Sequence, residues 1–390
     1  MTSSITSESV TSGHPDKVCD RIADTILDTI LAKDPLGRVA CEVTVCTDKV
    51  HIMGEISSSF TPDYEAVARE VISHIGYVRP YTGFDASTCR VVLDIHEQSP
   101  DIARGVFRKT EEDSGAGDQG MMFGYACRET ESLMPLPITL ANALTRRLEY
   151  VRHAGIVPWL LPDGKAQVTV EYESGVPARI STVIVSTQHE KEVDTDTLRD
   201  AVVEKVIRSA LPASMLSERT LCYVNPTGRF VIGGPAGDSG LTGRKIIADT
   251  YGGCARHGGG SFSGKDPTKV DRTGAYMARY IAKNVVAAGL ASRCEVELAY
   301  AIGLADPVSV ELETFGTGKI SDELLARWIR DNVDMRPAMM IRRFDLRRPI
   351  YGQLSCYGHF GDNAKNMLWE RTDLTDVLRT HFSFPAVHPT

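Results

Sequence analysis

The sequence alternates segments of helical and strand periodicity, and this alternation limits the possible folds more than any other feature. In residues 15–32, apolar side chains recur every four positions from Val18 to Ile30, which predicts a helix. Residues 39–45 and 50–56 have strand-like composition and flank the short segment CTDK, a pattern typical of a hairpin. Because hairpins are mixed with helices, we predict α+β modules rather than one doubly wound parallel sheet.

Further segments show the same two patterns. Helical spacing predicts helices over residues 63–76, 137–153, 195–209, 273–290 and 321–333. Strand composition predicts strands over residues 90–95, 167–173, 180–186, 294–302 and 308–314. Two segments interrupt the alternation. The polar residues 98–120 are expected to form a long loop, and residues 233–264 hold 11 of the 33 glycines, so their backbone can approach a bound group closely.

The charge balance argues against some partners. With 43 Lys and Arg against 51 Asp and Glu, the formal net charge is −8. A chain this acidic is poorly suited to coating nucleic acid or an anionic membrane, so an anionic ligand must be held by a local basic patch.

Size, cysteines and hydropathy set further limits. The 390 residues are enough for two or three domains. The nine scattered cysteines form no C-x-x-C pair, which indicates reduced thiols and argues against a zinc site. No apolar run approaches the ~20 residues that span a bilayer, and the first residues lack the pattern of a secretory signal. We therefore expect a cytoplasmic protein.

The clearest chemical signal is the segment 229–272, where glycines, basic residues and aspartates recur together. Its basic side chains are Arg244, Lys245, Arg256, Lys265, Lys269 and Arg272. Its carboxylates are Asp238, Asp249, Asp266 and Asp271. Glycine backbone and lysines suit a polyphosphate, and carboxylates beside them suit magnesium held between protein and phosphates. The alternative is a flexible surface loop with solvated charges.

Two glycine motifs resemble nucleotide-binding fingerprints without meeting their requirements. Residues 259–265, GGSFSGK, fit the phosphate loop, but Asp266 follows where that motif needs Ser or Thr, and no strand precedes it. Residues 115–120, GAGDQG, fit a dinucleotide motif, yet the preceding RKTEEDS is not an apolar strand. What remains is a tight loop that presents Asp118 and Gln119, either to a ligand or as turn residues.

Three smaller features are ambiguous when taken alone. SGHPDK (12–17) places His14 and Asp16 at a predicted helix N-terminus, where they serve either an anion and a metal or only capping. DGKAQ (163–167) either reaches a phosphate or forms a plain turn before a strand. Glu42 and Glu55 lie on the two strands of one hairpin, where either a buried cation or an edge salt bridge would satisfy them.

Taken together, these blocks resemble the bacterial type of S-adenosylmethionine synthetases, or methionine adenosyltransferases. The resemblance covers over nine tenths of the chain, from TSESVTSGHPDK near residue 6 to YGHFG at 357–361. Between them, in order, lie GAGDQGMMFGYA, PDGKAQVT, STQH, NPTGRFVIGGP, GDSGLTGRK and HGGGSFSGKDPTKVDR.

The resemblance implies a reaction with two stages. The methionine sulfur attacks the ribose C5′ of ATP in line and expels the triphosphate chain. The resulting tripolyphosphate is then hydrolysed to pyrophosphate and phosphate. Two Mg²⁺ ions and one K⁺ ion per subunit are implied as cofactors, because the leaving group departs only if its developing charge is stabilised.

The resemblance also implies a role for each residue that matches a family motif. The catalytic residues would be His14, at the bridging oxygen, Lys165, nearest the reacting carbon, and Arg244, Lys245 and Lys265. ATP would be bound by these five and by Asp163, Arg229, Phe230 and Asp238. Methionine would be bound by Glu55, Gln98, Asp118, Asp238, Lys269 and Ile302. Asp16 and Asp271 would hold magnesium, and Glu42 would hold potassium.

The implied fold has three similar α+β domains with pseudo-threefold symmetry. We expect an N-terminal domain, a gating loop, a central domain, a C-terminal domain and a loose tail, at residues 1–100, 101–113, 114–231, 232–380 and 381–390. Two subunits would build the sites across their interface, as a dimer of dimers. Two departures from the family pattern are Asp48, which is expected to alter its turn, and the context DRTGAY after Asp271.

Two other hypotheses compete with that of an active synthetase. A catalytically silent, regulatory member of the family would have lost a residue such as His14, Lys165 or Asp271, and none is lost. An ATP-dependent phosphotransferase is the reading that ignores the resemblance, and it would release ADP.

Overall fold

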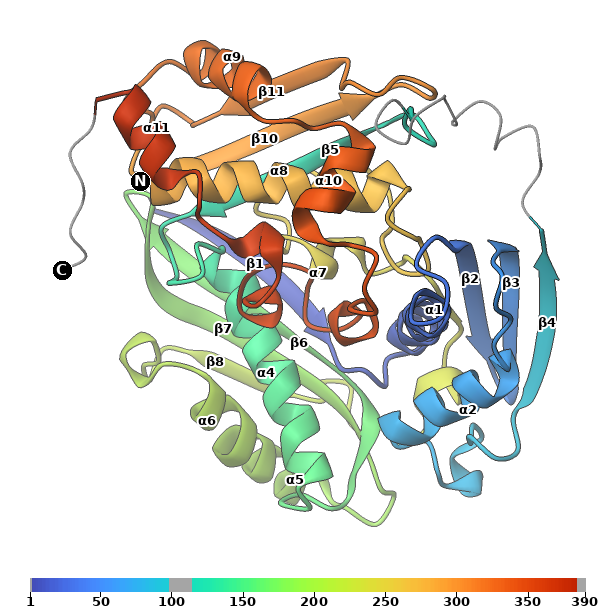
Figure 1. Ribbon diagram of the computed structural model, residues 1–390. Coiled ribbons are helices and arrows are strands. Elements are labelled where there is room, and N and C mark those ends of the chain that lie inside the picture. Colours follow the sequence, from blue (N-terminus) through green and yellow to red (C-terminus); the bar gives the residue numbers. More distant parts are fainter. Residues whose placement is uncertain (1, 98–113, 384–390) are drawn as a thin grey trace. The chain divides into compact units, whose positions relative to one another are not determined.

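The computed structural model (Figure 1) describes residues 2–97 and 114–383, which fall into two compact units. Unit 1 comprises residues 1–97, 136–254 and 349–359. Unit 2 comprises residues 98–135, 255–348 and 360–390.

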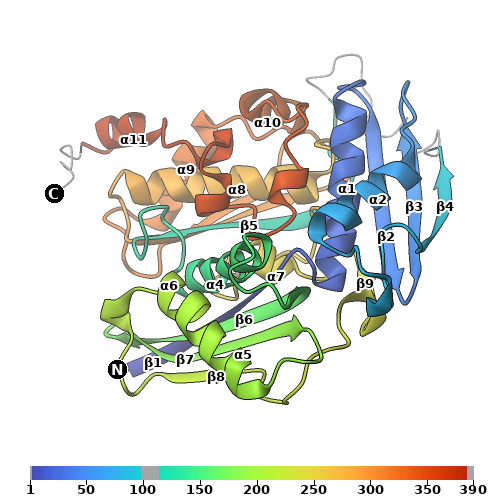
Figure 2. The same ribbon diagram turned by 90° about the horizontal axis from the view of Figure 1, so that it is seen from below.

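The first sheet of unit 1 has the strand order β4–β3–β2–β9. β2 (Arg38–Cys46) and β3 (Lys49–Ser57) form the predicted antiparallel hairpin. β4 (Arg90–His96) runs parallel to β3, and the short β9 (Gly240–Leu241) pairs with β2. Helix α1 (Pro15–Leu31) packs on β2, and α2 (Tyr64–Ile75) packs on α1, so both lie on one face of these strands (Figure 2).

The second sheet of unit 1 has the order β1–β6–β7–β8. Its strands are β1 (Thr2–Val10), β6 (Leu160–Glu173), β7 (Val176–His189) and β8 (Leu221–Val224). Helix α4 (Leu136–His153) packs on β1 and β6, and its apolar face meets residues such as Val168 and Val183 in the core. The remaining helices are α5 (Thr195–Val202), a π-helical turn (Val203–Ile207), α6 (Arg208–Ala210) and α7 (Ile246–Asp249).

Unit 2 is built on a sheet of order β11–β10–β5. Its strands are β5 (Gly120–Cys127), β10 (Arg293–Tyr300) and β11 (Ser309–Glu313). Helix α8 (Val270–Ala287), most of which is buried, packs on β5 and β10. The other helices are α9 (Asp322–Asn332), α10 (Pro337–Phe344) and α11 (Thr375–His381).

The same order of elements occurs three times along the chain. A strand (β1, β5 or β9) is followed by a long helix (α1, α4 or α8) and then by a hairpin (β2–β3, β6–β7 or β10–β11). In each case the leading strand pairs with a hairpin from a different repeat: β1 with β6, β5 with β10, and β9 with β2. The predicted α+β class is confirmed.

Several elements differ from the sequence-based expectation. β6 begins at Leu160, so DGKAQ lies within a strand and not in a turn before it. Helix α8 begins at Val270, which places Asp271 in its first turn. β1 was not expected, because it is rich in Ser and Thr. Two of its serines are buried and hydrogen-bonded through their hydroxyl groups, Ser7 to the Gly252 carbonyl (2.7 Å) and Ser9 to Thr145 (3.0 Å).

The turn between β2 and β3 is short. The strands pair up to Cys46 and Lys49, and Asp48 takes a left-handed conformation with φ of 56°. Aspartate is one of the few residues besides glycine that visit this region readily.

His381 ends α11, so the first residue of the expected tail is helical, while residues 384–390 lie outside the described part of the chain.

Gly124 fixes how closely β5 can approach α8. A β-carbon at Gly124 would lie 1.9 Å from the backbone carbon of Ala278. We expect Gly124→Ala to lower the free energy of unfolding by about 3 kcal/mol, because strand and helix must separate. Chemical denaturation measures this change. Gly117→Ala, whose nearest neighbour would be 3.7 Å away, is the control and should change stability by less than about 0.5 kcal/mol.

Candidate active site

His14 stands at the N-terminus of α1 as its capping residue. Its Nδ1 accepts a hydrogen bond from the backbone N–H of Asp16 at 3.2 Å. Burial, followed by the nearby charge of Lys245, lowers the pKa of His14 to about 4. At neutral pH the ring is therefore uncharged, and because Nδ1 accepts, Nε2 carries the proton. His14 can donate a hydrogen bond without bringing a positive charge.

Asp16, two residues later, is buried and holds two cationic side chains near it. Its Oδ2 accepts a hydrogen bond from Lys245 Nζ at 2.6 Å, and its Oδ1 accepts one from the Leu241 N–H at 3.0 Å. Arg244 Nε lies 3.9 Å from Oδ1. Burial alone would raise the pKa of Asp16, but the hydrogen bonds from Lys245 and Leu241 hold it below its ordinary value. The carboxylate is charged, and it orients Lys245.

β6 contributes Asp163 and Lys165 to the same unit. Asp163 is buried, and its Oδ2 accepts a hydrogen bond from the Gly234 N–H at 2.8 Å. Burial raises the pKa of Asp163 to about 6. Lys165 is exposed, and its charge is close enough to act on both His14 and Asp163. The register shift of β6 on β7 between Leu160 and Gly164 occurs at this point.

The segment before Gly234 carries Phe230 and is held by the STQH motif. His189 Nε2 accepts a hydrogen bond from the Phe230 N–H at 3.1 Å, and the Phe230 carbonyl accepts one from the His189 N–H at 3.0 Å. The side chain of Gln188 donates to the Val231 carbonyl at 3.0 Å. Arg229 is exposed and donates to the Lys191 carbonyl, whereas Asp238 is exposed and acts electrostatically on Asp163.

Unit 2 brings a second group of predicted residues together. Lys265 Nζ lies 2.7 Å from Asp271 Oδ2, and Asp271 sits in the first turn of α8. The backbone at Gly260 lies against the Asp271 carboxyl group. Lys269 Nζ donates to Asp266 Oδ2 at 2.6 Å, and Asp266 is completely buried. Each of these lysines is therefore already oriented by a carboxylate.

The loop that carries Asp118 pairs with the segment around Ile302 in unit 2. Ala116 and Ile302 form an isolated parallel bridge, and the Ala116 N–H donates to the Leu304 carbonyl at 2.8 Å. Both Asp118 and Ile302 are exposed. The GAGDQG loop therefore precedes β5 and presents Asp118.

Glu42 and Glu55 lie on neighbouring strands of unit 1. Both are exposed, on the same face of the β2–β3 hairpin, with Glu42 opposite Met53 and Glu55 opposite Ala40. The choice between a cation and an edge salt bridge at these two carboxylates therefore stays a prediction. Gln98, and the gating loop expected at 101–113, lie outside the described residues.

Three family models together match most of the chain. The S-adenosylmethionine synthetase N-terminal domain matches residues 2–100, the central domain residues 113–230 and the C-terminal domain residues 232–371. The chain belongs to the S-adenosylmethionine synthetase family. The resemblance read from the motifs is confirmed, and membership supports methionine adenosyltransferase activity in general, with ATP and methionine as substrates.

The carboxylates of this synthetase family member offer donor atoms for a metal ion. Among residues 2–97 and 114–383, no group of three or more His, Cys, Asp or Glu side chains could hold a metal by itself. Asp16 and Asp271 each offer one carboxylate beside a lysine. That donor set fits Mg²⁺, which commonly takes one or two carboxylates and completes its shell with substrate phosphates and water.

A buried charge cluster supports the site and was not predicted from the sequence. Lys17 Nζ donates to Asp20 at 2.8 Å and to Asp249, and all three side chains are buried. Asp20 also accepts a hydrogen bond from the Gly243 N–H at 2.8 Å. The cluster thereby ties the first turns of α1 to the segment that carries Lys245. The sequence signal available for this cluster was the lysine and aspartate at positions i and i+3 of one predicted helix.

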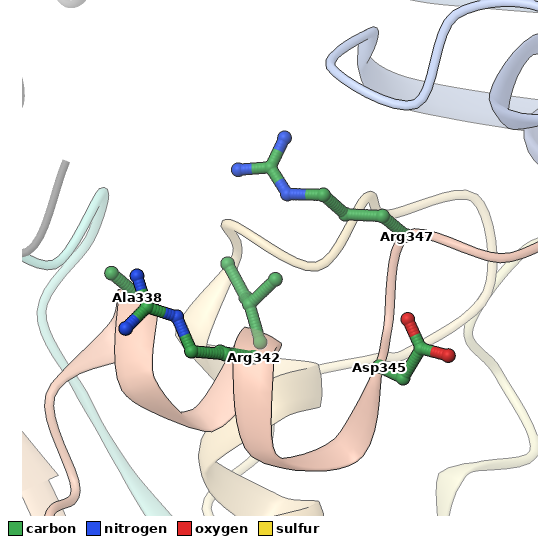
Figure 3. Close-up of a pocket in the computed structure, with 5 residues that line it drawn as sticks. Ala338, Arg342, Asp345 and Arg347 are labelled. Carbon is green, nitrogen blue, oxygen red and sulfur yellow. The ribbon is translucent and has the colours of Figure 1, made fainter.

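The pocket in Figure 3 is separate from the predicted site residues of its unit. It lies on α10 and the segment after it, and its lining residues are Ala338, Ile341, Arg342, Asp345 and Arg347. No residue predicted for catalysis, ATP, methionine or metal is among them.

The helices of the described residues are too short or too polar to span a membrane.

The pKa of Asp163 makes stability depend on pH in a direction unusual for a carboxylate. Its pKa is about 6 when folded against an ordinary value of 3.8, so between these pH values the folded state binds more protons than the unfolded state. The contribution of Asp163 to the free energy of unfolding therefore falls as pH rises through this window. We expect Asp163→Asn to reduce that fall by about 3 kcal/mol.

Urea denaturation of the ligand-free protein at several pH values between 4 and 7 measures the effect. Asp194→Asn is the control, because hydrogen bonds from Thr197 lower the pKa of that exposed carboxyl group. The contribution of Asp194 to stability changes with pH only near and below its ordinary pKa of 3.8, so Asp194→Asn should leave the fall between pH 4 and 7 nearly unchanged. A pH profile that Asp163→Asn leaves unchanged would contradict the raised pKa.

Proposed function

We propose that this chain is a methionine adenosyltransferase that also hydrolyses its tripolyphosphate product. The sulfur lone pair of methionine forms a bond to C5′ of ATP, and the bond from C5′ to the bridging oxygen breaks, leaving its electron pair on tripolyphosphate. Water then cleaves tripolyphosphate into pyrophosphate and phosphate. The observation that carries the proposal is the grouping of Lys165, Lys245 and an uncharged His14 about the N-terminus of α1.

The leaving group explains why the cations are needed. A neutral thioether is a weak nucleophile, and tripolyphosphate departs only if its growing negative charge is stabilised. In the proposal, the phosphate oxygens are held by four cationic side chains, those of Lys165, Arg244, Lys245 and Lys265. Asp16 and Asp271 keep Lys245 and Lys265 in fixed orientations, so that less reorganisation is needed when charge develops.

His14 has a distinct role because it is uncharged. Its Nε2–H would donate a hydrogen bond to the oxygen that bridges C5′ and the α-phosphorus, and this bond strengthens as that oxygen gains charge. A lysine at the same place would bind ground state and transition state more equally. The N-cap bond to the Asp16 N–H fixes which ring nitrogen faces the substrate.

The remaining assignments concern the other substrate groups. Phe230 would pack near adenine, with Asp163, Arg229 and Asp238 near the nucleoside. Methionine would be recognised by Glu55, Gln98, Asp118, Asp238, Lys269 and Ile302. Lys269 would have to share its ammonium group between Asp266 and the methionine carboxylate.

Cofactors and assembly complete the proposal. Asp16 and Asp271 would hold two Mg²⁺ ions per subunit and Glu42 one K⁺ ion, and these cations would supply further charge neutralisation on the phosphates. We also propose a homotetramer, built as a dimer of dimers with sites at the dimer interface, in the cytoplasm.

The first experiment measures phosphate and pyrophosphate release from ATP with Mg²⁺ and K⁺, with and without methionine. We expect both products to depend on methionine and to accompany S-adenosylmethionine. Norleucine, which resembles methionine but has no sulfur, is the control and should give neither product. Release indifferent to methionine would overturn the proposal, ADP would indicate a phosphotransferase, and complete inactivity would favour a silent regulatory member.

Lys165 should matter to chemistry more than to methionine binding. We expect Lys165→Ala to lower kcat by about 10²–10³, because it removes a cation next to the reacting carbon. The KM for methionine should change by less than about threefold, since the lysine faces the phosphates. Lys191→Ala removes an exposed lysine of the same unit and is the matched control. Near-normal turnover of Lys165→Ala would show that the lysine only forms part of the strand.

A further inference from the structure

Tyr77 is buried next to the loop that carries His14. It follows Gly76, the residue that ends α2, and its ring packs edge-on against Phe84 with centroids 5.4 Å apart. Its exposed fraction is 1%, and its hydroxyl donates a hydrogen bond to the carbonyl oxygen of Gly13. That carbonyl belongs to the peptide group whose nitrogen is that of His14. The hydroxyl therefore fixes the plane of the peptide that leads into the capping residue.

The same hydroxyl lies against the segment that follows Phe230. A β-carbon on Gly234 would be 2.1 Å from the Tyr77 oxygen, so no side chain fits there. Gly234 has φ of 60°, a conformation that suits glycine, and its N–H donates to Asp163 at 2.8 Å. The Tyr77 hydroxyl oxygen therefore lies between the SGHPDK loop and the GGP segment and sets the distance between them. The GGP segment is in turn hydrogen-bonded to the PDGK strand.

Other contacts hold the His14 loop from different sides. Thr11 Oγ1 donates to the Pro162 carbonyl at 2.8 Å, and Ser12 Oγ donates to Glu149 at 2.7 Å. These bonds restrain the residues before Gly13. The Tyr77 hydroxyl instead reaches the Gly13 carbonyl, immediately before His14.

We propose that Tyr77 is a positioning residue, which sets the placement of His14 relative to the Gly234–Asp163 contact through its hydroxyl group. The inference rests on the proposed function for its kinetic consequence. Tyr77 does not touch the reacting atoms in this proposal. It acts through the two backbone segments that carry groups assigned to ATP.

Tyr77→Phe removes only the hydroxyl oxygen and keeps the ring against Phe84. We expect kcat for S-adenosylmethionine formation to fall about tenfold, because a displaced hydrogen-bond donor loses its alignment with the bridging oxygen. The KM for methionine should stay within about twofold, since the affected segments are assigned to ATP. A purely structural role would lower the melting temperature without this division between kcat and KM.

Tyr300→Phe is the matched control. Tyr300 is also buried, and its hydroxyl also donates to a backbone carbonyl, that of Met335 at 2.7 Å in unit 2. It should lose thermal stability as Tyr77→Phe does, with kcat unchanged. Equal kcat in Tyr77→Phe and Tyr300→Phe would overturn the proposal.

Amide hydrogen exchange of the ligand-free protein separates this proposal from the proposed function. In Tyr77→Phe, peptides covering residues 11–17 and 230–238 should both exchange faster, and in Tyr300→Phe neither should. If the wild-type protein forms no S-adenosylmethionine, the proposed function fails, yet faster exchange in both peptides still supports the positioning role. Unchanged exchange in both overturns it.

Phe84→Leu keeps the test decisive if Tyr77→Phe does not fold. It keeps the hydroxyl group but removes part of the ring packing that holds it against Gly13 and Gly234, so we expect a smaller fall in kcat, about threefold, and faster exchange of the same two peptides. Wild-type exchange and kcat in Phe84→Leu would overturn the proposal.

Discussion

The buried ammonium group of Lys17 is the interaction on which the phosphate-binding end of unit 1 depends. Its burial would lower the pKa of the lysine, but Asp20 and Asp249 raise it above the ordinary value, so it stays charged. Conversely, burial raises the pKa of Asp249 to about 7, with Lys17 opposing the shift. Removing one partner would leave uncompensated buried charge. The cluster joins α1 to the segment around Lys245, and so it brings Lys245 to Asp16 and lets Asp16 lie beside His14.

The titratable groups at this end of unit 1 differ in charge state, because burial dominates the pKa of some groups and is outweighed in others. Asp16 is ionised because Lys245 and a backbone N–H stabilise its charge, whereas Asp163 is drawn toward the neutral form because burial dominates. His14 is neutral for the same reason as Asp163, although nearby lysines add to the effect. One small region thus contains a fixed anion, a carboxyl group near its titration point and an uncharged donor. A polyphosphate entering this region would meet lysine and arginine cations together with a histidine that is an uncharged hydrogen-bond donor.

Local pattern was enough to predict the helix at 15–32 and the hairpin at 39–56, because each buries its apolar face against a neighbour close in sequence. It failed for β1, where Ser7 and Ser9 are buried with their hydroxyl groups hydrogen-bonded to Gly252 and Thr145. It also failed for DGKAQ, which becomes a strand through pairing with residues near Thr187 and Val10. The supporting residues Tyr77, Gln188 and His189 act through backbone contacts across long sequence separations, and no spacing rule reveals such contacts. The roles of individual site residues came from the resemblance to the family, which the domain matches support without testing each residue.

The exchange of leading strands among the three repeats has a consequence for the integrity of the chain. Unit 1 takes residues from both sides of positions 98–113, and nine residue pairs between β1 and β6, with β9 on β2, join the two sides. A single peptide-bond break between residues 97 and 114 would therefore not yield two separable folded pieces. Each fragment would leave the other with an unpaired sheet edge, so the nicked protein should remain one non-covalent assembly, and complementary fragments should fold only in each other's presence.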